Sequence, residues 1–113
     1  MKIFKIKNLP IKNIRPKRKS MIENRFFGSY RELKRTENWK QIITNGKEVL
    51  IDKEIDVEDR IKIHIRIAES YFYLGEYTHA KENAYKAKHF IIKFKVGNND
   101  LLAKSYYLLA ISY

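Results

Sequence analysis

The chain has 113 residues, of which 44% are hydrophobic and 13% aromatic, and its formal net charge is +11 at pH 7. This length suits one domain with a modest core, and the aromatic content is typical of a packed protein rather than a disordered one. The absence of Cys excludes disulfides, thiolate metal sites and cysteine nucleophiles, and no apolar run reaches the roughly 18 residues of a membrane span. Since the N-terminus also lacks the apolar core of a signal peptide, we expect a cytoplasmic protein.

The positive charge is concentrated in residues 1–20, which contain eight basic residues and no acidic one. Residues 21–113 hold 16 basic and 13 acidic residues, a net charge of only +3. Apolar side chains are interleaved with the charges of this arm, and Pro10 and Pro16 keep it out of a helix. We therefore expect residues 1–14 to lie extended against the body or a partner. The basic residues that follow Pro10, and that can contact phosphates, anionic lipids or an acidic protein, are Lys12, Arg15, Lys17, Arg18 and Lys19.

Residues 21–51 are predicted to form a first pair of helices. Ser20 and Glu23 have the spacing of a capping box at the start of this segment. Apolar residues then recur at helical spacing, first at Ile22, Phe26, Tyr30 and Leu33, and after Thr36 at Trp39, Ile42, Gly46, Val49 and Leu50.

A β-hairpin is the alternative for residues 39–51, because Asn45-Gly46 between two apolar runs is a good two-residue turn. We favour the helix, since its apolar residues share one face and a lone hairpin would have no sheet to join. Gly46 costs such a helix about 1 kcal/mol relative to Ala. Its presence indicates that another backbone comes close.

The most specific pattern lies in residues 56–95, which are predicted to form two close antiparallel helices. Asp56, with Asp59 three residues on, can cap the first helix, and Gly75 supplies the left-handed conformation that ends it. An alanine seam on the return helix allows the two helices to approach closely. The positions that define the pattern are His64, Ile67, Ala68, Tyr71, Gly75, Tyr77, Ala80, Ala84 and Ala87.

This spacing resembles a tetratricopeptide repeat, whose signature has a large residue, then Leu-Gly and Tyr on the first helix, and Ala, an aromatic residue and Ala on the second. His64, Ala68 and Ala84 stand where the family usually has Trp, Gly and an aromatic residue. Residues 21–51 look like a degenerate earlier copy. The resemblance implies an all-α fold in which antiparallel helix pairs form a short solenoid of about five helices. Residues 21–113 would form this domain, preceded by the extended basic arm.

A last helix is predicted over residues 100–113, capped by Asn98 or Asn99. Its residues Tyr106, Leu109, Ala110 and Tyr113 repeat the spacing of His64, Ile67, Ala68 and Tyr71, displaced by 42 residues, so we expect them to pack on the central pair. The second helix of this pair is missing. The opposite face would expose large apolar residues, and burying them favours association, either into a homodimer or with a partner protein that binds this apolar C-terminal helix. These residues are Leu101, Tyr107, Leu108 and Ile111.

Residues able to do chemistry are sparse. His64, His79 and His89 do not have the spacing of metal ligands, and no glycine-rich loop can cradle a phosphate. A buried imidazole that fills a large-residue position is the favoured interpretation of His64. For Glu69 we favour a solvated or paired groove residue over a functional carboxylate. We therefore expect no enzymatic activity, no cofactor and no metal.

The resemblance also implies a function. In tetratricopeptide proteins the first helices of the repeats build a concave groove that binds peptides or helices of other proteins. On this chain the groove residues, on the exposed side of the central first helix, would be Lys62, Ile65, Arg66, Glu69, Phe72 and Tyr73. Arg and aromatic residues are the types that contribute most to interface energy. We therefore expect an adaptor, chaperone or inhibitor that binds another protein.

Two alternatives remain open. The run Pro-Lys-Arg-Lys at residues 16–19 is typical of nucleic-acid or nuclear-import patches, although short basic clusters are common. A nucleic-acid-binding protein using the basic arm is therefore the second hypothesis. The third is a fragment of a longer helical-repeat protein.

Overall fold

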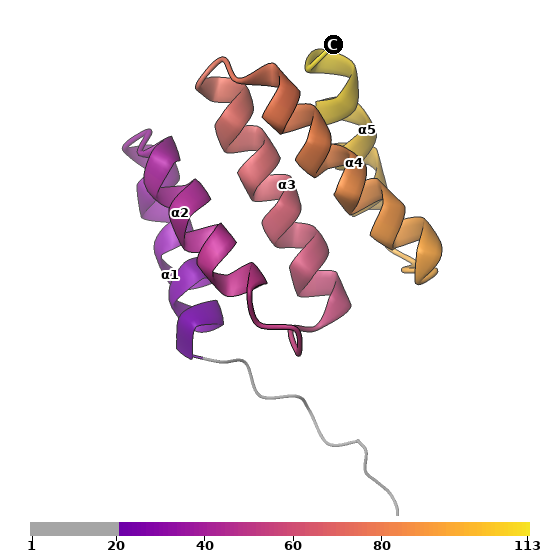
Figure 1. The fold of residues 1–113 in the computed structure, drawn as a ribbon, viewed down its shortest axis with the longest axis horizontal. Coiled ribbons are helices and arrows are strands. Elements are labelled where there is room, and N and C mark those ends of the chain that lie inside the picture. The colour runs from indigo at the N-terminus through magenta and orange to yellow at the C-terminus, as the bar shows by residue number, and fades with distance from the viewer. Residues whose placement is uncertain (1–20) are drawn as a thin grey trace, which may run out of the picture.

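The computed structural model describes residues 21–113, which form helices joined by short loops (Figure 1). This part of the chain contains no strand, so the predicted all-α fold is confirmed. The predicted basic arm and the capping box of Ser20 and Glu23 lie outside the described side chains. Within the described part, no helix combines the length and the apolar character needed to cross a bilayer. The helices are α1 (Met21–Arg35), α2 (Trp39–Leu50), α3 (Val57–Tyr73), α4 (Tyr77–Lys93) and α5 (Asn99–Ile111).

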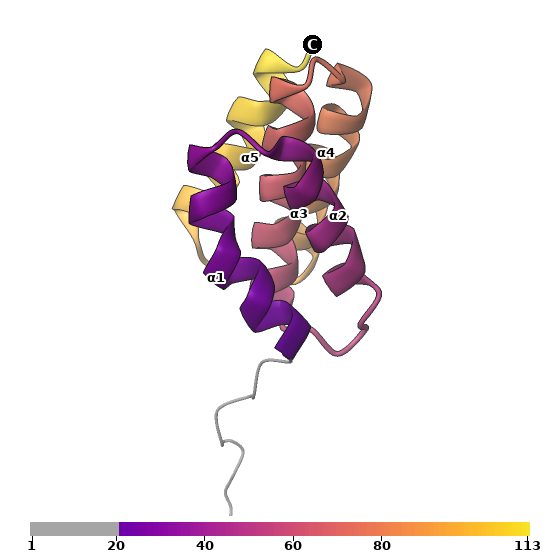
Figure 2. The ribbon, with the colours of Figure 1, turned by 90° about the vertical axis from the view of Figure 1, so that its left-hand side faces the viewer.

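Helix α3 lies at the centre of the molecule. Each helix packs against the next one along the chain, and the backbone of α3 also comes close to that of α5. Side chains of α1 reach α3 as well. Figure 2 shows α1 and α5 on one side of the molecule, α2 and α4 on the other, and α3 between them. The first and last helices therefore flank the same edge of α3, and the candidate site lies along that edge.

The same three-residue turn joins α1 to α2 and α3 to α4. Each turn contains one residue in the left-handed conformation, Glu37 with φ +58° in the first and Gly75 with φ +79° in the second. The next residue donates its N–H to the carbonyl five residues back, over 2.8 Å in the first turn and 2.9 Å in the second. This hydrogen bond is that of a Schellman turn. The predicted left-handed Gly75 is confirmed, and the two turns are equivalent at a displacement of 38 residues.

Residues 39–51 do not form the alternative hairpin, because helix α2 occupies this segment. Ile42, Gly46 and Val49 are buried on one face of α2. A Cβ atom at Gly46 would lie only 2.8 Å from each of two side-chain carbons of Ile67. The close approach expected at Gly46 therefore exists, but a side chain of α3 makes it and not another backbone.

The core has two parts, and α3 contributes to both. One face of α3 packs with α1, α2 and Ala80 of α4, and another packs with the rest of α4 and with α5. The predicted alanine seam of α4 is confirmed, because all three alanines are fully buried. Burying each large apolar side chain stabilises the fold by about 1.5 to 3 kcal/mol. The first cluster holds Phe26, Ile42, Ile43, Val49, Ile55, Ile63, Ile67, Tyr71 and Ala80, and the second Ile61, Ile65, Ala68, Ala84, Ala87, Ile91, Leu101 and Leu108.

Helices α3 and α5 both begin with a side-chain cap. The Asp56 carboxylate accepts a hydrogen bond from the N–H of Glu58 at 3.2 Å, and the Asn98 side-chain oxygen accepts one from the N–H of Leu101 at 3.1 Å. Both residues are N-caps, as predicted for Asp56. They are 42 residues apart, the displacement that relates the sequences of the two helices.

The orientation predicted for α5 is wrong for most of its residues, although Tyr107 is exposed and Leu109 packs partly against the second core cluster, as expected. Leu101 and Leu108, expected to face outward, are 5% and 6% exposed and pack on α3 and α4. Tyr106 and Tyr113, expected to pack on the central pair, are 50% and 87% exposed. Their counterparts on α3, His64 and Tyr71, face α4, which is the helix that follows α3. Within residues 21–113 no helix follows α5, so Tyr106 and Tyr113 have no such neighbour. The apolar face invoked for a homodimer is thus largely buried within the chain, and the homodimer itself stays a prediction.

The packing of α2 on α3 predicts opposite effects for two glycine substitutions in helices. Gly28 is exposed in α1 with nothing near its Cβ position, so Gly28→Ala should stabilise the protein by up to about 1 kcal/mol through helix propensity. Gly46→Ala gains the same propensity but collides with the fully buried Ile67, so it should destabilise by about 1 to 3 kcal/mol. Equilibrium unfolding in urea measures both changes. A Gly46→Ala variant as stable as Gly28→Ala would contradict the α2–α3 packing.

Candidate binding groove

A groove of about 330 Å³ opens between α3 and α5, with one residue of α1 at its edge. Ile65 and Leu108 are 3% and 6% exposed and form its floor. Phe72 of α3 and Tyr107 of α5 contribute aromatic rings to its lining. The complete lining is Lys34, Ile65, Arg66, Glu69, Phe72, Tyr73, Lys104, Tyr107, Leu108 and Ile111.

Glu69 is the single acidic residue of the groove lining, and α1 engages it. The Tyr30 hydroxyl donates a hydrogen bond to Glu69 Oε1 at 2.6 Å, and Lys34 Nζ lies 3.6 Å from Oε2. Burial and then this hydrogen bond to the carboxylate raise the pKa of Tyr30. The Arg66 guanidinium lies over the Tyr30 ring, 4.7 Å from its centre. These contacts hold α1 against α3, and they make Glu69 a paired groove residue.

The groove has a positive balance of charge. Its lining contains Lys34, Arg66 and Lys104 against Glu69 alone. A smaller hollow of about 230 Å³ adjoins the groove, shares its Arg66 and Lys104, and adds Lys62. Asp100 of α5, 3.2 Å from Lys104 Nζ, borders this hollow. Positive charge around an apolar floor favours a ligand that is acidic and partly apolar.

The structure brings the predicted partner-binding residues together. Five of them line the groove, and the sixth, Lys62, lines the adjoining hollow. Ile65 was expected to be exposed, and that expectation is wrong. The second core cluster, which includes Leu101 and Leu108 of α5, covers Ile65, so only its edge reaches the groove.

Sequence reasoning missed the contribution of α5 to this groove. Tyr107, Leu108 and Ile111 were assigned to a dimer interface, but they line the groove. A signal for this was present, because they lie 42 residues beyond Ile65, Arg66 and Glu69, which line it from α3. Lys34, which reaches the groove from α1, had no comparable signal.

No protein-family model, curated protein or solved structure matches the chain. The resemblance to tetratricopeptide repeats therefore stays a prediction.

His64 lies away from the groove, between α3 and α4. It is 6% exposed, its Nδ1 is 3.1 Å from Asn83 Oδ1, and its ring centre is 5.9 Å from that of Phe90. Burial lowers the pKa of His64 to about 4, and the cations Lys86 and Arg60 add to this, while the hydrogen bond to Asn83 opposes it. Among the described residues, no group of acidic and His side chains is arranged to hold a metal ion.

The lowered pKa of His64 predicts how stability depends on pH. Between pH 6.5 and about 4 the unfolded chain protonates this imidazole while the folded chain does not. The unfolded state then binds more protons, so the free energy of unfolding falls as the pH is lowered through this window. At about 1.4 kcal/mol per pKa unit, the full loss is roughly 3 kcal/mol.

Urea unfolding of the wild type and of His64→Gln at several pH values measures this effect. The His64→Gln variant, which keeps a polar side chain beside Asn83 but cannot titrate, should lose most of the pH dependence. His79→Gln, a change at an exposed His, is the matched control and should keep it. An unchanged slope in His64→Gln would show that other groups cause the dependence.

Proposed function

We propose that the protein is a non-catalytic interaction module of the tetratricopeptide type, and that its groove binds a segment of another protein. One observation carries the proposal. Residues from α1, α3 and α5 converge on one groove that combines an apolar floor, aromatic rings and an excess of cations. Aromatic and Arg side chains around a desolvated floor are the usual composition of an interface hot spot.

The lining defines the chemistry of the segment. An apolar side chain of the ligand would pack on Ile65 and Leu108 between the rings of Phe72 and Tyr107. Acidic side chains would meet Arg66 and Lys104, which lie on opposite sides of the groove on α3 and α5. Arg66 is already held over the Tyr30 ring, so less side-chain entropy is lost when it meets a carboxylate. The proposed ligand is an acidic segment with regularly spaced apolar residues.

We propose a function without catalysis because the two residues best suited to acid–base chemistry are already engaged or buried. Glu69 is engaged by Tyr30 and Lys34, and His64 is buried beside Asn83 outside the groove. Neither presents a free acid or base to a ligand in the groove. An adaptor, chaperone or inhibitor acting in the cytoplasm fits such a binding surface.

The second candidate function, nucleic-acid binding, is favoured by the eight basic residues of residues 1–20. The two functions respond differently to salt. Binding to phosphates should weaken steeply between about 50 and 200 mM salt, whereas a ligand held on the apolar floor should lose much less affinity.

Peptide display against the full chain tests the groove. We expect enrichment of peptides that combine acidic and apolar residues, and at least about tenfold weaker binding of these peptides to Tyr107→Glu and to Arg66→Glu. Tyr106→Glu is the matched control, because Tyr106 neighbours Tyr107 on α5 but does not line the groove. Its affinity should equal that of the wild type. Peptides that bind all these variants equally, or that enrich no acidic residues, would contradict the proposal.

A further inference from the structure

The interface between α3 and α4 shows how a first helix is covered by the helix that follows it. The Tyr71 ring lies 5.0 Å from that of His79, and Ala68 packs with Ala84 and Ala87 of α4. His64 faces Asn83 in the same interface. The four α3 residues of this face are all buried, and they are Ile61, His64, Ala68 and Tyr71.

The corresponding face of α5 is uncovered. The N-caps Asp56 and Asn98 are 42 residues apart. The residues that lie 42 positions after these four are Ala103, Tyr106, Ala110 and Tyr113. All four are exposed. Ala and Tyr recur at the last two positions, and a ring recurs at the second. Helix α5 thus has the small and aromatic residues of a face that receives another helix, and within residues 21–113 no helix covers it.

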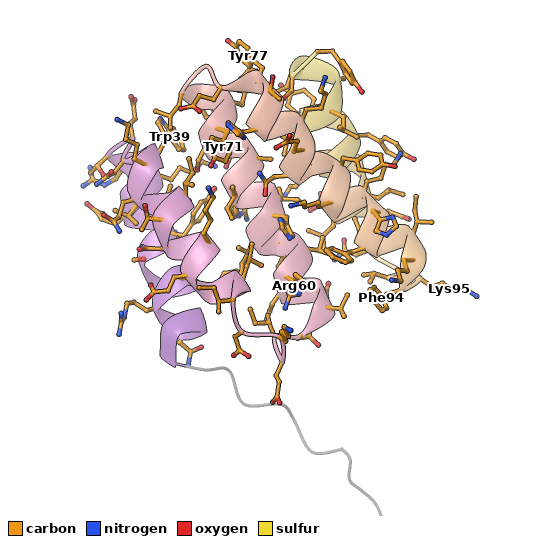
Figure 3. The ribbon with its side chains drawn as sticks, in the orientation of Figure 1. Trp39, Arg60, Tyr71, Tyr77, Phe94 and Lys95 are labelled. Atoms are coloured by element: carbon orange, nitrogen blue, oxygen red, sulfur yellow. The ribbon has the colours of Figure 1, made fainter. Side chains whose placement is uncertain are left out.

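Tyr71 and Tyr113 show the difference directly. Tyr71 of α3 (Figure 3) is 8% exposed, with Lys47 of α2 5.5 Å from its ring centre and the His79 ring of α4 5.0 Å from it. Tyr113 likewise has a lysine of the preceding helix, Lys81 of α4, 4.4 Å from its ring centre. It is nevertheless 87% exposed, and within residues 21–113 no helix stands beside it as α4 stands beside Tyr71.

A hollow of about 550 Å³ lies next to this face, between α4 and α5. Its lining includes Lys81, Lys86 and Tyr113, and Lys88 lies over the rings of Tyr85 and Tyr106 at 5.2 and 5.5 Å. The acidic residue of the lining is Glu82, whose carboxylate is 3.4 Å from the ring of His79. The surface around the uncovered face is therefore aromatic and positively charged.

We propose that this face, formed by Ala103, Tyr106 and Ala110 of α5 and by Tyr113 just beyond its last turn, docks an acidic α-helix of a partner protein. The helix takes the position on α5 that α4 takes on α3. Small residues at the spacing of Ala80, Ala84 and Ala87 let it approach the exposed alanines, and acidic residues beside them meet the lysines of α4. The proposed contact would repeat the packing that the chain already has between α3 and α4.

Charge distinguishes this occupant from two others. A second copy of the chain would bring its own Lys81, Lys86 and Lys88 toward the same lysines. The arm of residues 1–20 contains eight basic residues and no acidic one, so the lysines repel it as well. An acidic helix is attracted instead.

The docking face is distinct from the groove. Tyr106 and Tyr107 are adjacent in sequence, yet Tyr107 lines the groove and Tyr106 lies with Lys88 on the other side of α5. The two surfaces are therefore separable by mutation, and both can be occupied at once.

The test uses a synthetic helical peptide with Ala at the spacing of Ala80, Ala84 and Ala87 and Glu at the flanking positions. Fluorescence anisotropy measures its binding to the full chain. Ala110→Gln adds bulk without charge at an exposed helix position, so it should weaken binding at least about tenfold, as should Tyr106→Glu. Tyr107→Glu should bind like the wild type, and circular dichroism confirms that each variant is folded. A peptide of scrambled sequence should not bind.

Several results would overturn the proposal. One is equal binding of the scrambled peptide, or no binding of the designed peptide up to about 1 mM. Another is a loss of affinity in Tyr107→Glu as large as in Tyr106→Glu, which would place the peptide in the groove. A wild-type dimer in sedimentation equilibrium that Ala110→Gln dissociates would make a second copy the occupant. Salt-sensitive binding of a single-stranded oligonucleotide that Tyr106→Glu abolishes and Ala110→Gln leaves intact would make nucleic acid the ligand.

Discussion

The close packing of α3 against small residues on both neighbouring helices is the constraint on which the rest of the structure depends. On one side Ile67 occupies the space that a side chain at Gly46 would fill, and on the other Ala68 packs with Ala84 and Ala87. Because both neighbours approach so closely, α3 contributes to both parts of the core. Its remaining edge, with Arg66 and Glu69, is left to face the groove.

Helix α5 depends on this arrangement, because the surface that α3 and α4 present decides which of its faces is buried. Leu101, Ser105 and Leu108 fill that surface, which leaves one exposed stripe on each side. One stripe, with Tyr107, completes the groove, and the other, with Tyr106, is open. A helix that is apolar nearly all round therefore serves the core, the groove and the proposed docking face at once.

The sequence revealed features that local chemistry determines. The N-cap at Asp56, the left-handed Gly75 and the alanine seam of α4 follow from capping, backbone freedom and spacing. Features that depend on tertiary contacts could not be predicted from the sequence. The left-handed Glu37 has no glycine to mark it, and Lys34 reaches the groove only because α1 lies beside α3. The face of α5 was predicted wrongly, because apolar residues all round a helix leave no stripe to orient it.

Helix α5 has a buried stripe with Tyr107 on one side of it and Tyr106 on the other, and single-cysteine scanning tests this arrangement. The chain contains no Cys, so each variant has one thiol, whose rate of modification in the native protein reports its exposure. Tyr106→Cys, Tyr107→Cys and Ala110→Cys should react nearly as fast as in the unfolded chain, and Leu101→Cys, Ser105→Cys and Leu108→Cys far more slowly. Fast reaction at positions 101 and 108 with protection at 106 and 110 would show that the opposite face of α5 is buried.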